Sequence, residues 1–313
     1  MADKELSSAG HKLGQLIGDW YEQYFALPLL EKVAKHLKLY LDHRFRTRAA
    51  RESDKIIWHD EDNNAVNFDF VMEVDGSDSA RGIPVGFFEC FWRRGSRHSR
   101  DKARDDSGKL MPMRDVYPSA RFLGIVAGGD FTAPARALLQ SRNIDLLYVP
   151  KAKIVAAFES HGLQMDYPDK LVEVEKAKLA ELFEKGLSGD VKRKAAESLC
   201  EMVGETSLNT YVDRVRAALG ALPQEIRFLA QKQSKPAVFE SVVAASEFLN
   251  HPTFDFSAPT EDFIYQITYS DGTDFERHVS TLDHLRLLHN EVERLAQHVS
   301  NLTKTRKKNS SRR

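Results

Sequence analysis

Two acidic residues stand inside runs of large apolar side chains. Asp69 lies in the segment Phe-Asp-Phe-Val at 68–71, and Glu89 lies in Phe-Phe-Glu-Cys-Phe at 87–91. An ionised carboxylate in an apolar strand is costly unless a partner compensates its charge. If the two strands are neighbours, a divalent cation satisfies both carboxylates at once. The residue types leave a second interpretation open, in which one or both acids form an ion pair with the arginines that follow Glu89.

An arginine-rich segment begins directly after the Glu89 strand. Residues 93–104 contain six Lys or Arg and one Asp. Guanidinium groups donate paired hydrogen bonds to phosphate, and such clusters supply the salt-dependent part of DNA binding. We therefore expect five arginines to contact DNA, namely Arg93, Arg94, Arg97, Arg100 and Arg104. The alternative is a solvated helix face balanced by Asp105 and Asp106.

The net charge of the whole chain does not reflect the local positive charge of this segment. The whole chain carries 45 Lys and Arg against 46 Asp and Glu, a net charge of −1, yet residues 81–121 hold ten basic and five acidic residues. A second basic run begins at Lys304 and forms a basic C-terminal tail. Because local charge decides contact with phosphate, near-neutrality of the chain does not exclude a nucleic-acid partner.

The elements that position these residues follow from hydrophobic periodicity. Apolar residues at three- and four-residue steps predict a helical region from Leu13 to Leu41. Apolar or alternating runs predict strands at 55–58, 66–74, 83–92, 121–127 and 144–149. Capping residues and turns between these runs predict helices at 99–109 and from Thr132 to Asn143. A strand, a helix and a strand at this spacing form a parallel crossover. Residues 1–165 are therefore predicted to form an α/β domain on a mixed sheet flanked by helices.

The remainder of the chain, 166–313, is predicted to be a mainly α-helical domain for recognition or dimerisation. Helices are expected around 171–185, 190–203, 208–220, 224–232 and 237–249, and a hairpin from Ile264 to Phe275. The last helix carries apolar residues at alternating steps of three and four, namely Leu285, Leu288, Val292, Leu295, Val299 and Leu302. This heptad seam is typical both of a coiled-coil dimer and of ordinary packing against the same chain.

The order of these elements resembles the PD-(D/E)XK nuclease superfamily, which has the restriction-endonuclease-like fold. The resemblance covers residues 27–150 and depends on an Asp in one strand, an acid in the next strand, and a later strand-helix-strand from Arg121 to Val149. It implies that Asp69 and Glu89 hold Mg²⁺, which activates a water for attack on a phosphodiester. It also implies a DNA endonuclease, acting as a homodimer in a prokaryotic restriction or defence system.

The sequence departs from the family pattern at one position. The superfamily places a lysine two residues after the second acid, because alternate residues of a strand share a face. This chain has Phe91 there. The following helix offers Lys102 as a catalytic replacement, with Arg93 as second choice.

Other functions remain open on the sequence. A nuclease-like protein that has lost its lysine would bind DNA without cutting it, and an adaptor built on the helical half would not bind DNA at all. The two cysteines do not support a disulfide framework, and no apolar run approaches the length of a membrane span. We expect a soluble, cytoplasmic protein with no membrane partner.

Overall fold

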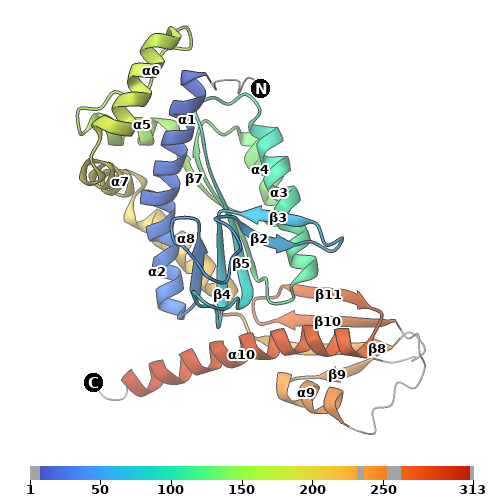
Figure 1. The fold of residues 1–313 in the computed structure, drawn as a ribbon. Helices are drawn as coiled ribbons and strands as arrows, with labels where there is room; N and C mark the ends of the chain where they lie inside the picture. The colour runs from blue at the N-terminus through green and yellow to red at the C-terminus, as the bar shows by residue number, and fades with distance from the viewer. Residues whose placement is uncertain (1–7, 231–235, 252–261, 311–313) are drawn as a thin grey trace. The chain divides into compact units, whose positions relative to one another are not determined.

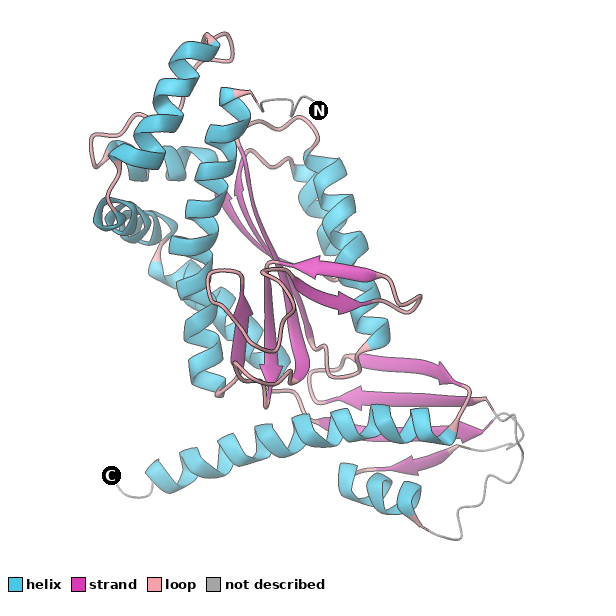
Figure 2. Cartoon of the chain, viewed as in Figure 1, coloured by secondary structure: helices cyan, strands magenta, loops and turns pink. Residues whose placement is uncertain are grey.

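The computed structural model describes residues 8–230, 236–251 and 262–310. The chain is a mixed α/β protein in which helices flank a mixed sheet (Figures 1 and 2). No helix among the described residues is both long enough and apolar enough to cross a membrane.

The N-terminal half follows the predicted order of elements. It comprises α1 (Ala9–Trp20), the π-helical turn η1 (Tyr21–Ala26), α2 (Leu27–Leu37), β1 (Tyr40–His43), β2 (Ile56–His59), β3 (Ala65–Phe68), β4 (Phe70–Val74), β5 (Ile83–Arg93), α3 (Ser99–Val116), β6 (Phe122–Gly129), α4 (Ala133–Ser141), β7 (Asp145–Pro150) and α5 (Lys151–Glu159). The predicted N-terminal helix ends earlier than expected, because Lys38 adopts a left-handed backbone with φ of 52° and the next residues form β1.

A five-stranded sheet has the order β1-β4-β5-β6-β7, with β5 in the centre. Strand β1 pairs antiparallel with β4, and β6 pairs parallel with β7, with Gly124 opposite Asp145. The mixed sheet and its β6-α4-β7 parallel crossover confirm the prediction. Thr132 caps α4 as expected, since its side chain accepts a hydrogen bond from the backbone N–H of Ala135. Strands β2 and β3 form a separate two-stranded sheet.

The C-terminal half contains more strand than the sequence indicated. It comprises α6 (Glu173–Glu181), the π-helical turn η2 (Leu182–Gly186), α7 (Gly189–Val203), α8 (Glu205–Leu219), β8 (Pro223–Ala230), β9 (Ala237–Phe239), α9 (Val242–Asn250), β10 (Phe263–Tyr269), β11 (Asp274–Val279) and α10 (Leu282–Ser310). The predicted hairpin is confirmed as β10 and β11. The helix predicted at 224–232 is wrong over 224–230, because these residues belong to β8 and pair antiparallel with β10; residues 231 and 232 lie outside the described residues.

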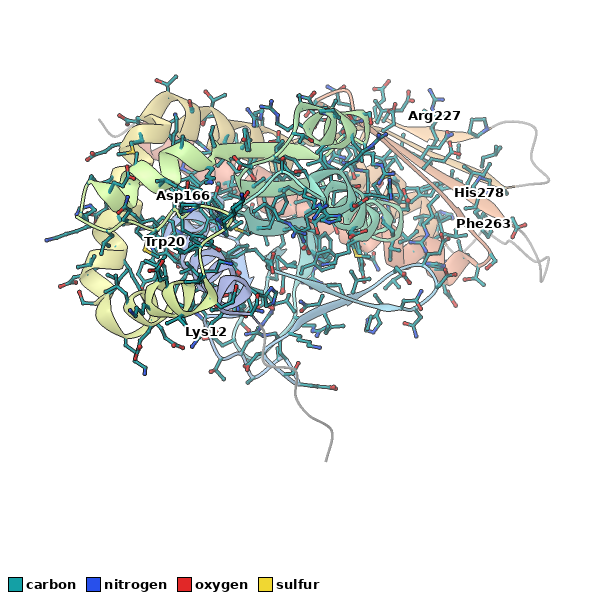
Figure 3. The ribbon with its side chains drawn as sticks, turned by 90° about the horizontal axis from the view of Figure 1, so that it is seen from above. Lys12, Trp20, Asp166, Arg227, Phe263 and His278 are labelled. Carbon is teal, nitrogen blue, oxygen red and sulfur yellow. The ribbon has the colours of Figure 1, made fainter. Side chains whose placement is uncertain are left out.

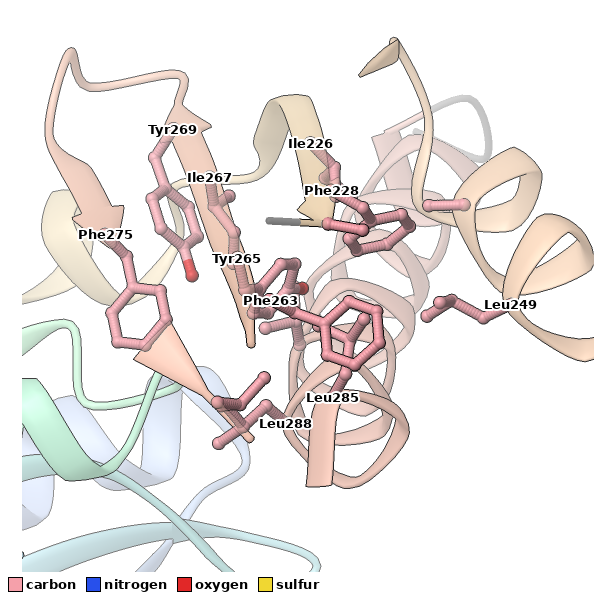
Figure 4. Packing of buried hydrophobic residues seen from close by; sticks show 14 of the residues in the cluster. Ile226, Phe228, Leu249, Phe263, Tyr265, Ile267, Tyr269, Phe275, Leu285 and Leu288 are labelled. Atoms are coloured by element: carbon pink, nitrogen blue, oxygen red, sulfur yellow. The ribbon is translucent and has the colours of Figure 1, made fainter. Parts of the chain in front are cut away.

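The strand at 223–230 has a simple physical reason. Ile226, Phe228 and Ala230 are buried while the residues between them are not, which is the two-residue period of a strand with one covered face. The four-stranded sheet has the order β11-β10-β8-β9. One face is covered by α9 and α10, and Figure 4 shows Phe228, Tyr265 and Leu285 in the resulting core.

The heptad seam of the last helix packs within its own chain. Five of its six residues, Leu285 to Val299, are buried, and α10 contacts β4, β10 and β11. The burial supports ordinary packing as the interpretation of the seam, and dimerisation stays a prediction. The side chains of the basic run from Lys304 lie outside what the structure describes.

The described residues form two compact units that interleave along the chain. Unit 1 contains 8–32, 88–108 and 124–213, and unit 2 contains 33–87, 109–123 and the described residues from 214 to 310. Neither unit begins or ends at residue 165, and the sequence-based division into 1–165 and 166–313 stays a prediction.

Candidate functional site

Strand β5 places Glu89 in the interior of unit 1. This strand is the central one of its sheet, and the exposed fraction of Glu89 is 3%. The prediction of a carboxylate inside a buried apolar strand is confirmed at this position. Because side chains alternate along a strand, Glu89 and Phe91 project from the same face of β5.

Helix α3 brings a lysine to that face. The Lys102 Nζ lies 5.3 Å from the centre of the Phe91 ring. The same Nζ lies 2.6 Å from Oδ1 of Asp106, one helical turn further on, and Asp106 is completely buried. Glu89, Phe91, Lys102 and Asp106 are called the β5–α3 site below. The structure thus places Lys102 beside Phe91, the residue two positions after Glu89.

The packing around this site is fixed by close backbone and aromatic contacts. Phe131 packs against Phe91 with ring centres 5.3 Å apart. The backbone N–H of Asp130 donates to the carbonyl of Arg93 at 2.8 Å. Gly129 precedes it with φ of 106°, and a Cβ there would lie 1.8 Å from the Arg93 oxygen. Only glycine permits this approach, which holds the end of β6 against the end of β5.

Asp69 belongs to unit 2, apart from the β5–α3 site in the division of the chain. It is half-buried and lies at a bend between β3 and β4. Strand β3 pairs with β2, whereas β4 pairs with β1, so the bend marks a change of sheet. The expectation that Asp69 lies inside a continuous strand is therefore wrong, although its carboxylate does follow a strand directly.

The donor set for a metal ion is small. No group of three or more His, Cys, Asp or Glu side chains is arranged to hold a metal among the residues that the structure describes. Proteins commonly bind Mg²⁺ through one or two carboxylates and leave the remaining positions to water and substrate phosphates. Glu89 fits that chemistry as an oxygen ligand, and the pairing of Asp69 with Glu89 on one Mg²⁺ stays a prediction.

The arginine segment contains one arginine held by contacts within the chain and others that are exposed. The Arg94 Nη1 lies 2.6 Å from Oδ1 of Asp169, and its Nε lies 3.7 Å from Oδ1 of Asp166, which is labelled in Figure 3. The Arg94 guanidinium also lies over the Tyr167 ring, 4.0 Å from its centre. This guanidinium holds the pKa of the Asp169 carboxyl below its ordinary value. Arg94 therefore ties the end of β5 to the segment before α6.

The exposed arginines lie around the start of α3. Arg97, Arg100 and Arg104 are exposed, whereas Arg93 is half-buried. Arg104 lies 3.6 Å from Asp101, which is also exposed, and such a surface pair contributes little to stability. The guanidinium groups of Arg93, Arg97 and Arg100 form no ion pair or hydrogen bond with other described residues. They are the arginines of the segment best placed to accept an external anion.

Several buried charges were missed by sequence reasoning. Asp106 could have been found, because it follows Lys102 by four residues, the spacing of an ion pair along a helix. Unit 2 also holds a buried network in which Arg48 bonds both Asp42 and Glu73 at 2.6 to 2.8 Å. Glu73 stands in the apolar run Phe-Val-Met-Glu-Val at 70–74 and could have been found by the signal that marked Asp69 and Glu89, whereas Asp42 and Arg48 carried no such signal.

Comparisons of the chain with protein-family models, with curated proteins and with solved structures found no match.

Proposed function

We propose that the chain is a Mg²⁺-dependent DNA endonuclease in which Glu89 and Lys102 act in one site. The observation that carries this proposal is the position of Lys102, whose ammonium lies 5.3 Å from the ring of Phe91. Phe91 stands two residues after a buried acid, where the resembling nucleases carry their lysine. A lysine from α3 thus supplies the positive charge that β5 lacks.

Each residue has a distinct role in this proposal. Glu89 is a metal ligand, with Asp69 as the second ligand predicted from sequence. The bound Mg²⁺ supplies an activated water and neutralises phosphate charge. Lys102 stabilises the negative charge that develops on the phosphoryl oxygens, as a preorganised cation does in a water-poor site. Arg97, Arg100 and Arg104 contact the DNA backbone, and a prokaryotic restriction or defence system with a homodimeric enzyme is the setting we propose.

A cleavage assay tests the proposal. Purified protein with Mg²⁺ is incubated with supercoiled, linear, branched and modified DNA, and nicking is measured on gels. Glu89→Gln and Asp69→Asn keep the shape of each side chain and remove its charge, so both are expected to abolish cleavage. If both variants cut as well as the parent protein, the site assignment is refuted.

Lys102 requires a design that separates catalysis from stability. Lys102→Met alone leaves the buried Asp106 without its ion-pair partner, which destabilises the fold. The double variant Lys102→Met with Asp106→Asn removes both charges and keeps both shapes. This variant is expected to fold and not to cut, whereas Asp106→Asn alone is expected to retain cleavage. Cleavage by the double variant at the parent rate would exclude Lys102 from the reaction.

A second candidate function is DNA binding without cleavage. It is favoured by the ion pair itself, because the Lys102 ammonium lies 2.6 Å from the Asp106 carboxylate and is thereby partly neutralised. In this case DNA is retarded in a gel with a steep dependence on salt, and no divalent metal produces nicks. Cleavage that requires Glu89 would rule this candidate out.

A further inference from the structure

A cavity of unit 1 lies where α1 and η1 face the end of β5, and Phe91 of the β5–α3 site is among its lining residues. Its volume is about 380 Å³, and it is lined by one side of α1 and η1 together with residues 90–94 of β5. Small-molecule sites in proteins occupy roughly 300 to 1,000 Å³. The cavity is therefore large enough for one small ligand.

The helix wall of this cavity lacks side chains where they would fill it. Gly10, Gly14 and Gly18 recur at four-residue spacing and so lie on one side of α1. A Cβ built on Gly14 meets no described atom within 4 Å, which is open space, whereas one on Gly18 meets Trp92 at 3.9 Å. Lys12 and Trp20, labelled in Figure 3, mark the same helix but do not line the cavity.

The strand wall presents donors that the described residues leave unused. The indole N–H of Trp92 is buried and meets no hydrogen-bond acceptor in the described part of the chain. A buried indole N–H ordinarily finds a partner, so an acceptor other than the described residues is expected. Next to it, the half-buried guanidinium of Arg93 forms no ion pair with described residues. This wall is suited to an anionic group beside an aromatic surface.

Acceptors stand on the helix wall. Glu22, with 5% exposure, belongs to η1 and lines the cavity, and Asp19 precedes it by three residues on the same side. A carboxylate has about four lone-pair sites, so it can accept from a ligand in addition to its contacts within the chain. π-Helical turns of this kind occur frequently at functional sites.

We propose that this cavity binds one nucleotide whose base carries an exocyclic amino group. The phosphate pairs with Arg93 and accepts a hydrogen bond from the Trp92 indole N–H, the base lies along the open glycine side of α1, and the amino group donates to Glu22 or Asp19. Cytosine and adenine carry such an amino group and thymine does not. The nucleotide is either free or a unit of a single strand, and both share this chemistry.

The proposal concerns binding alone and does not depend on cleavage. Affinities for dCMP and dTMP, and for short oligomers of each, are measured by calorimetry. We expect dCMP to bind roughly tenfold more tightly than dTMP, the discrimination that one good base contact provides. Binding of dCMP identifies a free-nucleotide site, and binding of the cytosine oligomer alone identifies a strand site. Equal affinity for the cytosine and thymine ligands, or binding of neither, overturns the proposal.

Gly14→Leu places a side chain in the open space and is expected to abolish binding. Glycine in a helix interior is less favourable than leucine, so this variant keeps or raises the melting temperature, and loss of binding is not a sign of unfolding. Gly108→Leu is the matched control, since Gly108 also lies within a helix, also meets nothing within 4 Å, and does not line the cavity. Glu89→Gln is expected to lose cleavage and keep nucleotide binding, so the two proposals fail separately. Retained binding in Gly14→Leu refutes the site.

Discussion

Glu291 makes the stability of unit 2 depend on pH. It lies on α10, where burial raises the pKa of its carboxyl from 4.5 to about 7. A hydrogen bond from Ser119 at 3.3 Å, together with the charges of Arg277 and Arg294, opposes this effect without cancelling it. The folded state therefore holds a proton at pH values where the unfolded chain has released it.

The sign and size of the effect follow from these two pKa values. Below pH 4.5 both states are protonated and Glu291 costs nothing. As the pH rises from 4.5 to 7 the unfolded state gains stability relative to the folded state, and above 7 the full cost is present. One pKa unit corresponds to about 1.4 kcal/mol, so the free energy of unfolding falls by about 3 kcal/mol across this range.

Glu291→Gln removes the titrating group and keeps the shape of the side chain. We expect the variant to match the parent protein below pH 4.5 and to be more stable by up to about 3 kcal/mol above pH 7. Urea unfolding, followed by tryptophan fluorescence with Trp20 and Trp92 replaced by Phe so that Trp58 of unit 2 alone reports, measures the difference. Glu293→Gln, the same substitution at another position of α10, is the control. Equal stability of Glu291→Gln and the parent above pH 7 would refute the reasoning.

Three further predictions concern the packing and the arginine segment. Arg48→Met leaves the buried Glu73 without its arginine, while Asp42 keeps Arg51, and is expected to destabilise unit 2 by roughly 3 to 5 kcal/mol, measured by thermal unfolding. Gly129→Ala forces a Cβ to within 1.8 Å of the Arg93 oxygen at a positive φ, so its melting temperature should fall, and an unchanged value would contradict the close approach. Arg97→Ala and Arg100→Ala should each lower the salt dependence of DNA binding by about one released counterion, measured by titration at several salt concentrations.

The sequence predicted the inner strands of the N-terminal sheet well because they are largely apolar, whereas the edge strand β1, with the sequence Tyr-Leu-Asp-His, was not predicted. β5 and β6 lie inside the sheet and are buried along most of their length, so a run of apolar residues between turns was a sufficient signal. β8 gave no such signal, since its Gln, Glu, Arg and Leu also favour helix. Its partner β10 lies more than thirty residues further along the chain, and only that pairing decides the conformation.

The candidate site was predictable only in part, for the same reason. The burial of Glu89 followed from its apolar neighbours, and Lys102 followed from the helix that comes after them. The ion pair of Arg94 could not be predicted from the sequence, because its partner Asp169 is separated from it by 75 residues. Distant ion pairs of this kind decide which arginines of a basic segment remain available to a ligand.

The position of α10 in the chain has a consequence for biosynthesis. Leu285, Leu288 and Val292 complete the core of the four-stranded sheet, yet they follow all four of its strands in the sequence. The 29 residues of α10 take roughly 1.5 to 6 s to synthesise at about 5 to 20 residues per second. Phe228, Tyr265 and their neighbours therefore keep one side uncovered until α10 has been made and has packed, and chaperones that recognise apolar surface are expected to act on the chain before that point.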